Sequence, residues 1–590
     1  MRIQTLLIAL FLLLVSCTRA YAADFSFDYD VTYAVKDTGT THVRQNITIT
    51  NETSEYYPRN YTLTISSNSV ANVSARDSGS ITPEVGTAND ETTITVPFNT
   101  IAAGIHKQLS FTLEYDLGEV ATLKGGIWEI IIPGTEKKED VNSYTIQLTT
   151  PDSFGTPAYF SPPKKSPNLI WEWPEHGGKG ISVAFGDLQS FAFTLHYHLF
   201  NESAQRQVQE ITLPPDTAFQ KIIVNSISET PKSVRTDPDG NWLATFPLSP
   251  HSEKEIIASG SAYLFIKPQS GFKLKLNDEE YQLYTKPQLY WEQSDEITTK
   301  ARELRTPEAI YNFVVSYLQY DYSRLEPGIE RLGAKTAFSY PKRAVCMEFS
   351  DLFVALTRSA GIPAREIHGY AYTTNSRLQP LSLGADILHA WAEYYDSNRQ
   401  LWIPVDPTWG NTTHGVNYFH QLDFNHVAFA ILGVSSDYPY PAGAFRTTNS
   451  QKDVFMEFTT PESKVPQPEF LLKFPTLMFA VSGLTTTVPV TVLNTGAVLI
   501  PKLALTTTTF NARAETESQL PPFATTVVPL QINPGIVWVG GKTLFTVTTQ
   551  GQEFSSTITV IPLYVPLAAG ALIIALFGIL MLHVKRKITR

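Results

Sequence analysis

Two different spacings of apolar residues divide the chain. Over residues 24–293, and again over 455–559, short runs rich in Thr, Val, Ile, Phe and Tyr alternate apolar with polar positions. Gly, Asn, Asp and Pro separate these runs, so each run predicts a β-strand, and many short strands at regular spacing predict β-sandwiches. Over residues 294–320 the apolar residues instead recur at helical spacing. The pattern therefore predicts β-rich domains on both sides of one segment that mixes helix and strand.

The length of 590 residues is enough for several domains. The fold class that we predict is multidomain, with N-terminal β-sandwich domains, one α+β domain, a C-terminal β-sandwich and one transmembrane helix. We expect a signal peptide at 1–22, a β-sandwich at 23–120, β-rich domains at 121–200 and 201–293, the α+β domain at 294–450, an immunoglobulin-like β-sandwich stalk at 455–560, the transmembrane helix at 561–584 and a cytoplasmic tail at 585–590.

The N-terminus has the features of a signal peptide. Arg2 supplies a positive charge, residues 6–15 are apolar, and Ala20 and Ala22 form a small-x-small cleavage site. We expect cleavage after Ala22. An uncleaved anchor helix is one alternative, although the apolar run is short for a membrane span. Lipidation of Cys17, which stands in a loose match to a bacterial lipobox, is another.

The C-terminus has the features of a membrane anchor. Residues 561–584 contain no Asp, Glu, Lys or Arg, and this run is long enough to cross the hydrocarbon core of a bilayer. Lys585, Arg586 and Lys587 follow it, and the positive-inside rule places such a tail in the cytoplasm. We therefore expect a single-pass protein of the cell membrane, with the N-terminal bulk of the chain extracytoplasmic.

Composition argues against several classes of function. The 45 basic and 56 acidic residues give a net charge of -11, which is unfavourable for binding nucleic acid. No glycine-rich phosphate loop follows a predicted strand, so we expect no bound nucleotide. His368, His414, His420 and His426 lack the spacing of metal ligands, so we expect no metal site and no cofactor.

Cysteine usage draws attention to one residue. The chain has two cysteines, and Cys17 would leave with the signal peptide. The mature protein would then hold only Cys346, and no intrachain disulfide could form. A lone cysteine in an exported protein is either a reactive thiol or a small buried hydrophobic residue, and its surroundings decide between the two.

Cys346 is predicted to lie in the first turn of a helix. Apolar residues follow it at helical spacing until Gly361 and Pro363, which end the helix. A helix N-terminus favours the thiolate form of cysteine, and its unpaired N–H groups could help to hold an oxyanion. We expect Glu348 and Asp351, near the helix start, to be solvated or to complement the helix dipole.

A histidine and an aspartate are predicted to meet across a β-hairpin in the segment DILHAWAEYYDSNRQLWIPVDPTWG. If Ser397 and Asn398 form a two-residue turn, His389 lies directly opposite Asp406, with about 4.5–5.5 Å between the Cβ atoms. The carboxylate could then orient the imidazole and stabilise its charged form. Trp391 falls on the same face as His389, where it either lines an acyl site or simply packs.

Four features in this order carry a resemblance to a known family: a cysteine that opens a helix, the stretch RSAGIPAR at 358–365, the triplet HAW that begins at His389, and the triplet DPT that begins at Asp406. Over roughly residues 301–429 they are similar to the transglutaminase-like superfamily of microbial exported proteins. One departure is Ala344, where many relatives have Gly.

The resemblance implies a papain-like α+β domain with Cys346 as nucleophile, His389 as general base and acid, and Asp406 as the orienting carboxylate. Trp391 is a weaker candidate for substrate binding. The implied activity is acyl transfer from an amide bond of a protein or peptide, cell-wall peptides included, through a thioester. Water as acceptor gives a peptidase or amidase, and an amine gives a protein transglutaminase. The alternative is a non-catalytic cell-surface binding or scaffold protein that retains the fold.

Overall fold

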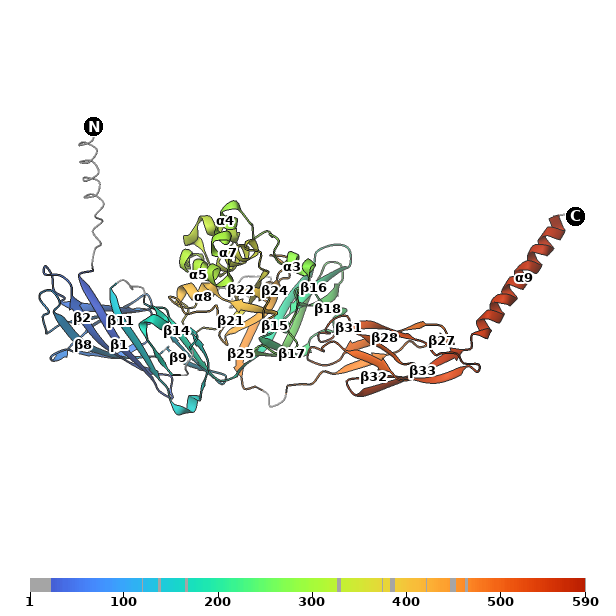
Figure 1. Cartoon of the computed structure of the whole chain (residues 1–590), viewed down its shortest axis with the longest axis horizontal. Coiled ribbons are helices and arrows are strands. Elements are labelled where there is room, and N and C mark those ends of the chain that lie inside the picture. Colours follow the sequence, from blue (N-terminus) through green and yellow to red (C-terminus); the bar gives the residue numbers. More distant parts are fainter. Residues whose placement is uncertain are drawn as a thin grey trace, which may run out of the picture.

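The computed structural model describes residues 23–588, apart from 119, 136–139, 165–167, 326–329, 374, 382–387, 421, 446–451 and 462–464. The expected signal peptide and Cys17 lie outside the described residues. β-rich modules follow one another along the long axis of the molecule, helices gather on one side near its middle, and helix α9 (Tyr564–Ile588) projects from the far end (Figure 1).

Three sheets build the N-terminal region. Every second side chain of β2 is buried, because one face of the strand packs on a core that includes Val43 and Ile47. The sheet orders are β13-β11-β1-β2-β8-β4-β5, β3-β7-β6 and β12-β14-β10-β9. The elements are β1 (Phe25–Val35), β2 (Thr41–Asn51), β3 (Asn60–Ile65), β4 (Val70–Arg76), β5 (Ser80–Ile81), β6 (Glu84–Ala88), β7 (Glu91–Pro97), β8 (Gln108–Leu117), β9 (Ala121–Lys124), β10 (Ile127–Ile132), β11 (Val141–Thr149), η1 (Asp152–Phe154), β12 (Pro157–Ser161), β13 (Ile170–Trp171), α2 (Trp173–His176) and β14 (Ile181–Phe185).

Two sheets form the next region, with orders β17-β20-β15-β25 and β16-β19-β18. The two long strands β15 and β20 pair antiparallel from Leu188↔Phe265 to Asn201↔Ser252, and β25 comes from farther along the chain to pair with β15. The strands are β15 (Leu188–Asn201), β16 (Gln207–Leu213), β17 (Gln220–Ile227), β18 (Ser233–Thr236), β19 (Trp242–Leu248), β20 (Ser252–Phe265) and β25 (Val454–Thr459).

The mixed domain combines the antiparallel sheet β23-β22-β21-β24 with helices on one side of it (Figure 1). Helix α7 contacts β21 and β22, and Phe349 and Leu352 of α7 belong to the same buried cluster as Trp391. The elements are α3 (Asp278–Leu283), α4 (Asp295–Leu304), α5 (Pro307–Tyr317), η2 (Tyr322–Arg324), α6 (Gly333–Ser339), η3 (Pro341–Arg343), α7 (Cys346–Ser359), β21 (Ala364–Ala371), β22 (Leu388–Asp396), β23 (Leu401–Val405), α8 (Pro407–Thr412) and β24 (His426–Leu432).

Side-chain amides from the neighbouring region cover β24, the edge strand of this sheet. The amide of Gln220 bonds both the N–H and the carbonyl of Ala428, at 2.8 and 3.0 Å. Asn241 does the same to Ile431, with 2.7 Å for each bond. Because each amide satisfies one backbone donor and one acceptor as a further strand would, the edge is closed and β24 is held in place.

The C-terminal sandwich contains sheets β26-β28-β31 and β27-β33-β32-β29-β30. Residues 564–585 of α9 are apolar and long enough to cross a membrane. The strands are β26 (Phe470–Lys473), β27 (Phe479–Val481), β28 (Thr486–Asn494), β29 (Ala504–Thr507), β30 (Ala512–Glu515), β31 (Thr525–Ile532), β32 (Gly541–Thr549) and β33 (Gln552–Ile561). Sheets at both ends, helices around the mixed domain and one apolar C-terminal helix confirm the predicted fold class.

Candidate active site

Cys346 is the first residue of α7, in the place that the apolar spacing predicted, and its side chain is half-buried. The carboxylate of Glu348 accepts a hydrogen bond from the N–H of Val345, at 3.0 Å, and so caps the helix from within. The thiol therefore stands where the unpaired N–H groups of the first helical turn and the positive end of the helix dipole meet.

His389 and Asp406 meet as predicted, but the predicted hairpin register is wrong. β22 pairs with β23 from Asp396↔Leu401 to Ala392↔Val405, so four residues and not two form the connection. Asp396 causes the difference, because its carboxylate accepts hydrogen bonds from the next backbone N–H groups and sets a longer loop. The register shifts by two residues, which keeps the side chains on the same faces.

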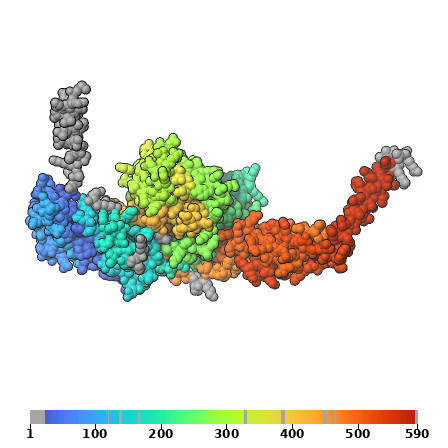
Figure 2. Space-filling view, viewed as in Figure 1, coloured from blue at the N-terminus to red at the C-terminus, as the bar shows by residue number. Residues whose placement is uncertain are grey.

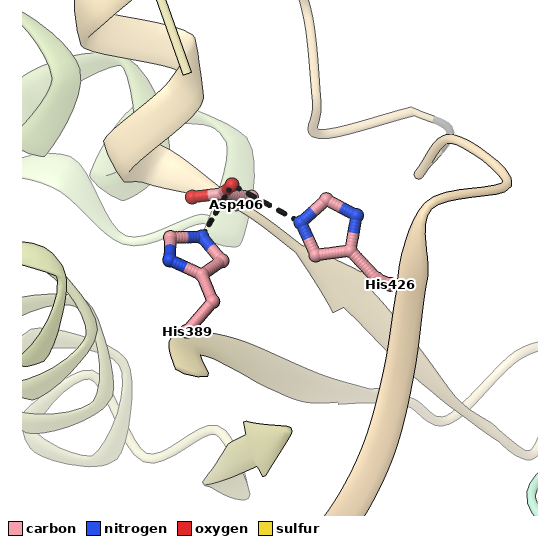
Figure 3. Close-up of side chains that lie close together, drawn as sticks. All are labelled: His389, Asp406 and His426. Atoms are coloured by element: carbon pink, nitrogen blue, oxygen red, sulfur yellow. Dashed lines mark hydrogen bonds and ion pairs between the residues drawn. The ribbon is translucent and has the colours of Figure 1, made fainter. Parts of the chain in front are cut away.

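Asp406 lies beyond the end of β23, at the N-cap of α8, and is fully buried. Its Oδ1 accepts hydrogen bonds from the N–H groups of Thr408 and Trp409, at 2.8 and 3.1 Å. Its Oδ2 accepts from Nε2 of His389 at 3.0 Å and from Nε2 of His426 at 3.4 Å (Figure 3). Burial opposes ionisation, but the His389 and His426 imidazoles outweigh it and hold the pKa of Asp406 well below its ordinary value.

His389 is buried, and its Nδ1 has no hydrogen-bond partner among the residues that the structure describes. Burial favours the neutral ring, but Asp406, with a further contribution from the nearby Cys346, outweighs it and raises the pKa of His389 to about 9. Since Nε2 donates to Asp406, Nδ1 is the nitrogen available to take a proton from the thiol.

His426, which sequence spacing gave no reason to select, completes the carboxylate environment. It is the first residue of β24, and its Nδ1 lies 2.6 Å from Oδ1 of Asp423. Burial lowers its pKa, but Asp423 and Asp406 outweigh burial and raise the pKa of His426 to about 9. A ring that donates to a carboxylate from each nitrogen carries a positive charge. The only sequence signal was Asp423 three residues before His426, which says nothing of Asp406.

A glutamate from the N-terminal region contacts the turn that carries Asp423 and His426. Glu129 of β10 is buried, and its carboxylate accepts hydrogen bonds from the N–H of Phe424, at 3.2 Å, and from the side-chain amide of Asn425. Burial and the charge of Asp423 raise the pKa of Glu129 to about 8. Glu129 therefore holds the turn from which His426 reaches Asp406.

Trp391 belongs to the core, with 2% of its surface exposed. Its ring lies 6.2 Å from that of His389 and 5.1 Å from that of His426, measured between centroids. Trp409 contacts both imidazoles as well, at 5.1 and 4.5 Å. Of the two alternatives for Trp391, this burial favours packing, and the two indoles wall the histidine–aspartate cluster off from water.

Of the two alternatives expected for Glu348 and Asp351, solvation and complementing the helix dipole, solvation is wrong, since both are fully buried. The carboxylate of Glu348, which caps the start of α7, fits the second alternative. Glu348 pairs with Arg324 at 3.0 Å. Asp351 accepts hydrogen bonds from Arg331, which also bonds Glu366. Both arginines come from the segment before α7. The tertiary fold brings them next to the carboxylates of Glu348 and Asp351.

The ligand atoms of His389, Asp406 and His426 all lie within 4.8 Å of one another, a set that could hold a metal ion. The same atoms are already joined by the two Nε2 to Oδ2 hydrogen bonds, and all three side chains are buried. A metal would have to replace both bonds, whereas hydrogen bonding alone accounts for the arrangement. The expectation of no metal stays a prediction.

Comparison with known proteins supports the resemblance noted in the sequence. Residues 292–407 match the family model of the Transglutaminase-like superfamily, which confirms that resemblance for this segment. A "putative cysteine protease" from Cytophaga hutchinsonii is similar at 16% identity and a TM-score of 0.28, over 46% of this chain and 99% of that chain. A "putative protease" from Parabacteroides distasonis gives 9% and 0.20, over 87% and 94%. The search of curated proteins found no match.

Proposed function

We propose that this protein is a cysteine-dependent acyl-transfer enzyme that acts on amide bonds through Cys346, His389 and Asp406. The observation that carries the proposal is a fully buried His389–Asp406 pair, whose Nδ1 has no hydrogen-bond partner by geometry among the described residues, close to a cysteine at a helix N-terminus. Nucleophile, base and orienting carboxylate are the groups that thioester chemistry needs.

The proposed reaction has two halves. The thiol proton of Cys346 passes to Nδ1 of His389, and the sulfur attacks the amide carbonyl carbon. The oxyanion so formed lies near the N–H groups that open α7. The C–N bond then breaks, the leaving nitrogen takes the proton back from His389, and a thioester remains on Cys346. An acceptor that loses a proton to His389 then attacks the thioester carbonyl, the C–S bond breaks, the acyl group leaves on the acceptor, and the sulfur of Cys346 takes the proton back from His389.

The acceptor and the substrate belong to the proposal as well. Water gives a peptidase or amidase and an amine gives a protein transglutaminase, with proteins or peptides, cell-wall peptides included, as substrates. If α9 crosses the membrane with its basic tail in the cytoplasm, the site lies in the extracytoplasmic space on a tether. A non-catalytic surface-binding protein that keeps this fold is the second candidate, since β-sandwich modules make up most of the chain.

Alkylation of Cys346 by iodoacetamide over a range of pH tests the proposal. We would measure the rate in the full chain by peptide mapping, in the parent and in His389→Ala. His368→Ala is the matched control, because His368 also pairs with a buried carboxylate of this domain, Glu366 at 3.0 Å.

We expect alkylation to persist well below pH 8, His389→Ala to slow it there, and His368→Ala to leave it unchanged in folded protein. The proposal would be contradicted if Cys346 is alkylated only in unfolded protein, or if the rate does not depend on His389. Either result would favour the non-catalytic binding protein.

A further inference from the structure

The end of the C-terminal sandwich that leads into α9 presents apolar side chains to solvent. Residues 533–540 (NPGIVWVG), which join β31 to β32, contain no charged residue. Within them Ile536 is 76% exposed, Trp538 77% and Val539 88%. Exposure of this degree at three large apolar side chains in one loop marks an interaction surface rather than ordinary surface variation.

This loop lies against the start of α9. Gly541, directly after it, pairs with Val560 near the end of β33. At Gly540 an added Cβ would lie 2.4 Å from both the carbonyl oxygen of Val560 and Cδ of Pro562, so the loop backbone is in close contact with the chain that enters the helix. α9 leaves the end of the sandwich farthest from the rest of the molecule (Figure 2).

Buried Ser482 fixes the loop in position. Its N–H donates to the carbonyl of Ile561 at 2.9 Å, which ties it to the end of β33. Its hydroxyl accepts a hydrogen bond from the N–H of Val537 at 2.7 Å and lies 3.0 Å from the carbonyl oxygen of Gly535. Leu484, which lies with Ser482 in the connection between β27 and β28, is 50% exposed. The exposed side chains are therefore held beside the helix start.

A bilayer surface matches this chemistry better than a protein partner does. Residues 564–585 of α9 are apolar enough to span a membrane and are not buried in the protein, so the bilayer would begin where the loop lies. Tryptophan is enriched at membrane interfaces, where its ring is apolar and its N–H stays hydrated. Lys542, two residues beyond Gly540, could meet anionic headgroups.

We propose that residues 533–540, together with Leu484, form a membrane-contact tip that enters the interfacial layer of the bilayer spanned by α9. The stalk is then held at two places, the helix and the tip. This inference rests on α9 as the anchor and is independent of the chemistry proposed for Cys346.

Quenching of Trp538 fluorescence by brominated lipid tests the tip. The full chain is reconstituted into phosphatidylcholine vesicles with and without bromine near the headgroup end of the acyl chains. The other eight tryptophans are buried or half-buried, so the difference between the parent and Trp538→Phe isolates the emission of Trp538. We expect bromine to reduce this difference emission on the order of twofold, as for an interfacial indole.

Two outcomes would overturn the proposal. If the emission of Trp538 is equal in both lipids and fully open to aqueous acrylamide, the tip lies in water. If it is shielded from acrylamide but unaffected by bromine, a protein surface or a second copy covers it. Ile536→Ser with Val539→Ser should weaken the quenching of Trp538 severalfold, whereas Val85→Ser, at an exposed position of β6, should leave it unchanged.

Discussion

Two clusters of ionisable side chains with buried carboxylates lie in the mixed domain, and they differ in their central cation. In one, the guanidinium of Arg331 bonds Asp351 and Glu366 at once, Trp291 donates to Asp351 at 2.9 Å, and the partly exposed His368 pairs with Glu366 at the edge of the cluster. In the other, the carboxylate of Asp406 accepts hydrogen bonds from the imidazoles of His389 and His426. A guanidinium does not give up its proton, whereas an imidazole exchanges one near neutral pH. The comparison indicates that the arginine cluster stabilises the fold and that the histidine cluster is suited to chemistry.

Replacement of the central carboxylate in each cluster should separate these roles most strongly. Asp406→Asn should lower acylation of Cys346 by about 10³–10⁴-fold, because the amide no longer orients and stabilises the charged imidazole. The burst of nitrophenol from p-nitrophenyl acetate measures this step. Asp351→Asn, on the same helix as Cys346, should change the burst of folded protein only a few-fold. If the two variants lose the nitrophenol burst equally, the histidine cluster is no more important for the chemistry than the arginine cluster.

Removal of the guanidinium should damage stability more than chemistry. Arg331→Met leaves the carboxylates of Asp351 and Glu366 buried without their partner, and we expect the mixed domain to lose about 3–5 kcal/mol. Hydrogen exchange of peptides from α7 and β21 measures that loss. Arg331→Lys keeps the charge but not the forked geometry, so its loss should be smaller. If the mixed domain of Arg331→Met keeps the stability of the parent, the arginine cluster does not stabilise the fold.

The pH dependence of stability should follow the histidine cluster. The folded pKa values of His389 and His426, about 9, lie above the ordinary value of 6.5. Their contribution is therefore complete below about pH 6.5 and is lost as the pH rises through about 9, by on the order of 3 kcal/mol for each imidazole. Hydrogen exchange of β22 and β24, corrected for intrinsic rates, should show this fall in the parent and a smaller one in Asp406→Asn. A flat profile would contradict the paired imidazoles.

Glu129 should give a second pH-dependent contribution to stability, at lower pH than the histidines. Its folded pKa of about 8 lies above the ordinary 4.5, so its contribution to stability falls as the pH rises between those values. Glu129→Gln keeps an acceptor for the N–H of Phe424 and removes the ionisation, so the profile between pH 4.5 and 8 should flatten by at most about 5 kcal/mol. Glu114→Gln, a partly exposed carboxylate on β8, is the control and should change nothing.

Local patterns predicted the parts of the site that lie within one segment. The apolar spacing after Cys346 placed the thiol at a helix start, because one face of α7 had to be buried. The meeting of His389 with Asp406 was predicted from a register that is off by two residues. It survived because strand faces repeat every two residues.

Parts assembled from distant segments could not be predicted. His426 reaches Asp406 only because β24 pairs with β21, and Glu129 arrives from another sheet. The burial of Asp351 depends on Arg331, whose approach has no local signature. Charged side chains next to a helix start are usually exposed, so the local rule favoured the wrong answer here.

The contact of Glu129 with the turn before His426 also bears on how the chain folds during synthesis and on whether its domains can be separated. Glu129 and Asn425 are separated by 296 residues, and Ser161 of the N-terminal region bonds the carbonyl of Asn417 across 256. During synthesis the N-terminal modules emerge first, so the turn before His426 closes onto a surface already in place. A fragment cut to the matched residues 292–407 would keep Cys346 and lose this support. We therefore expect that the mixed domain cannot be separated from the N-terminal region without losing the position of His426.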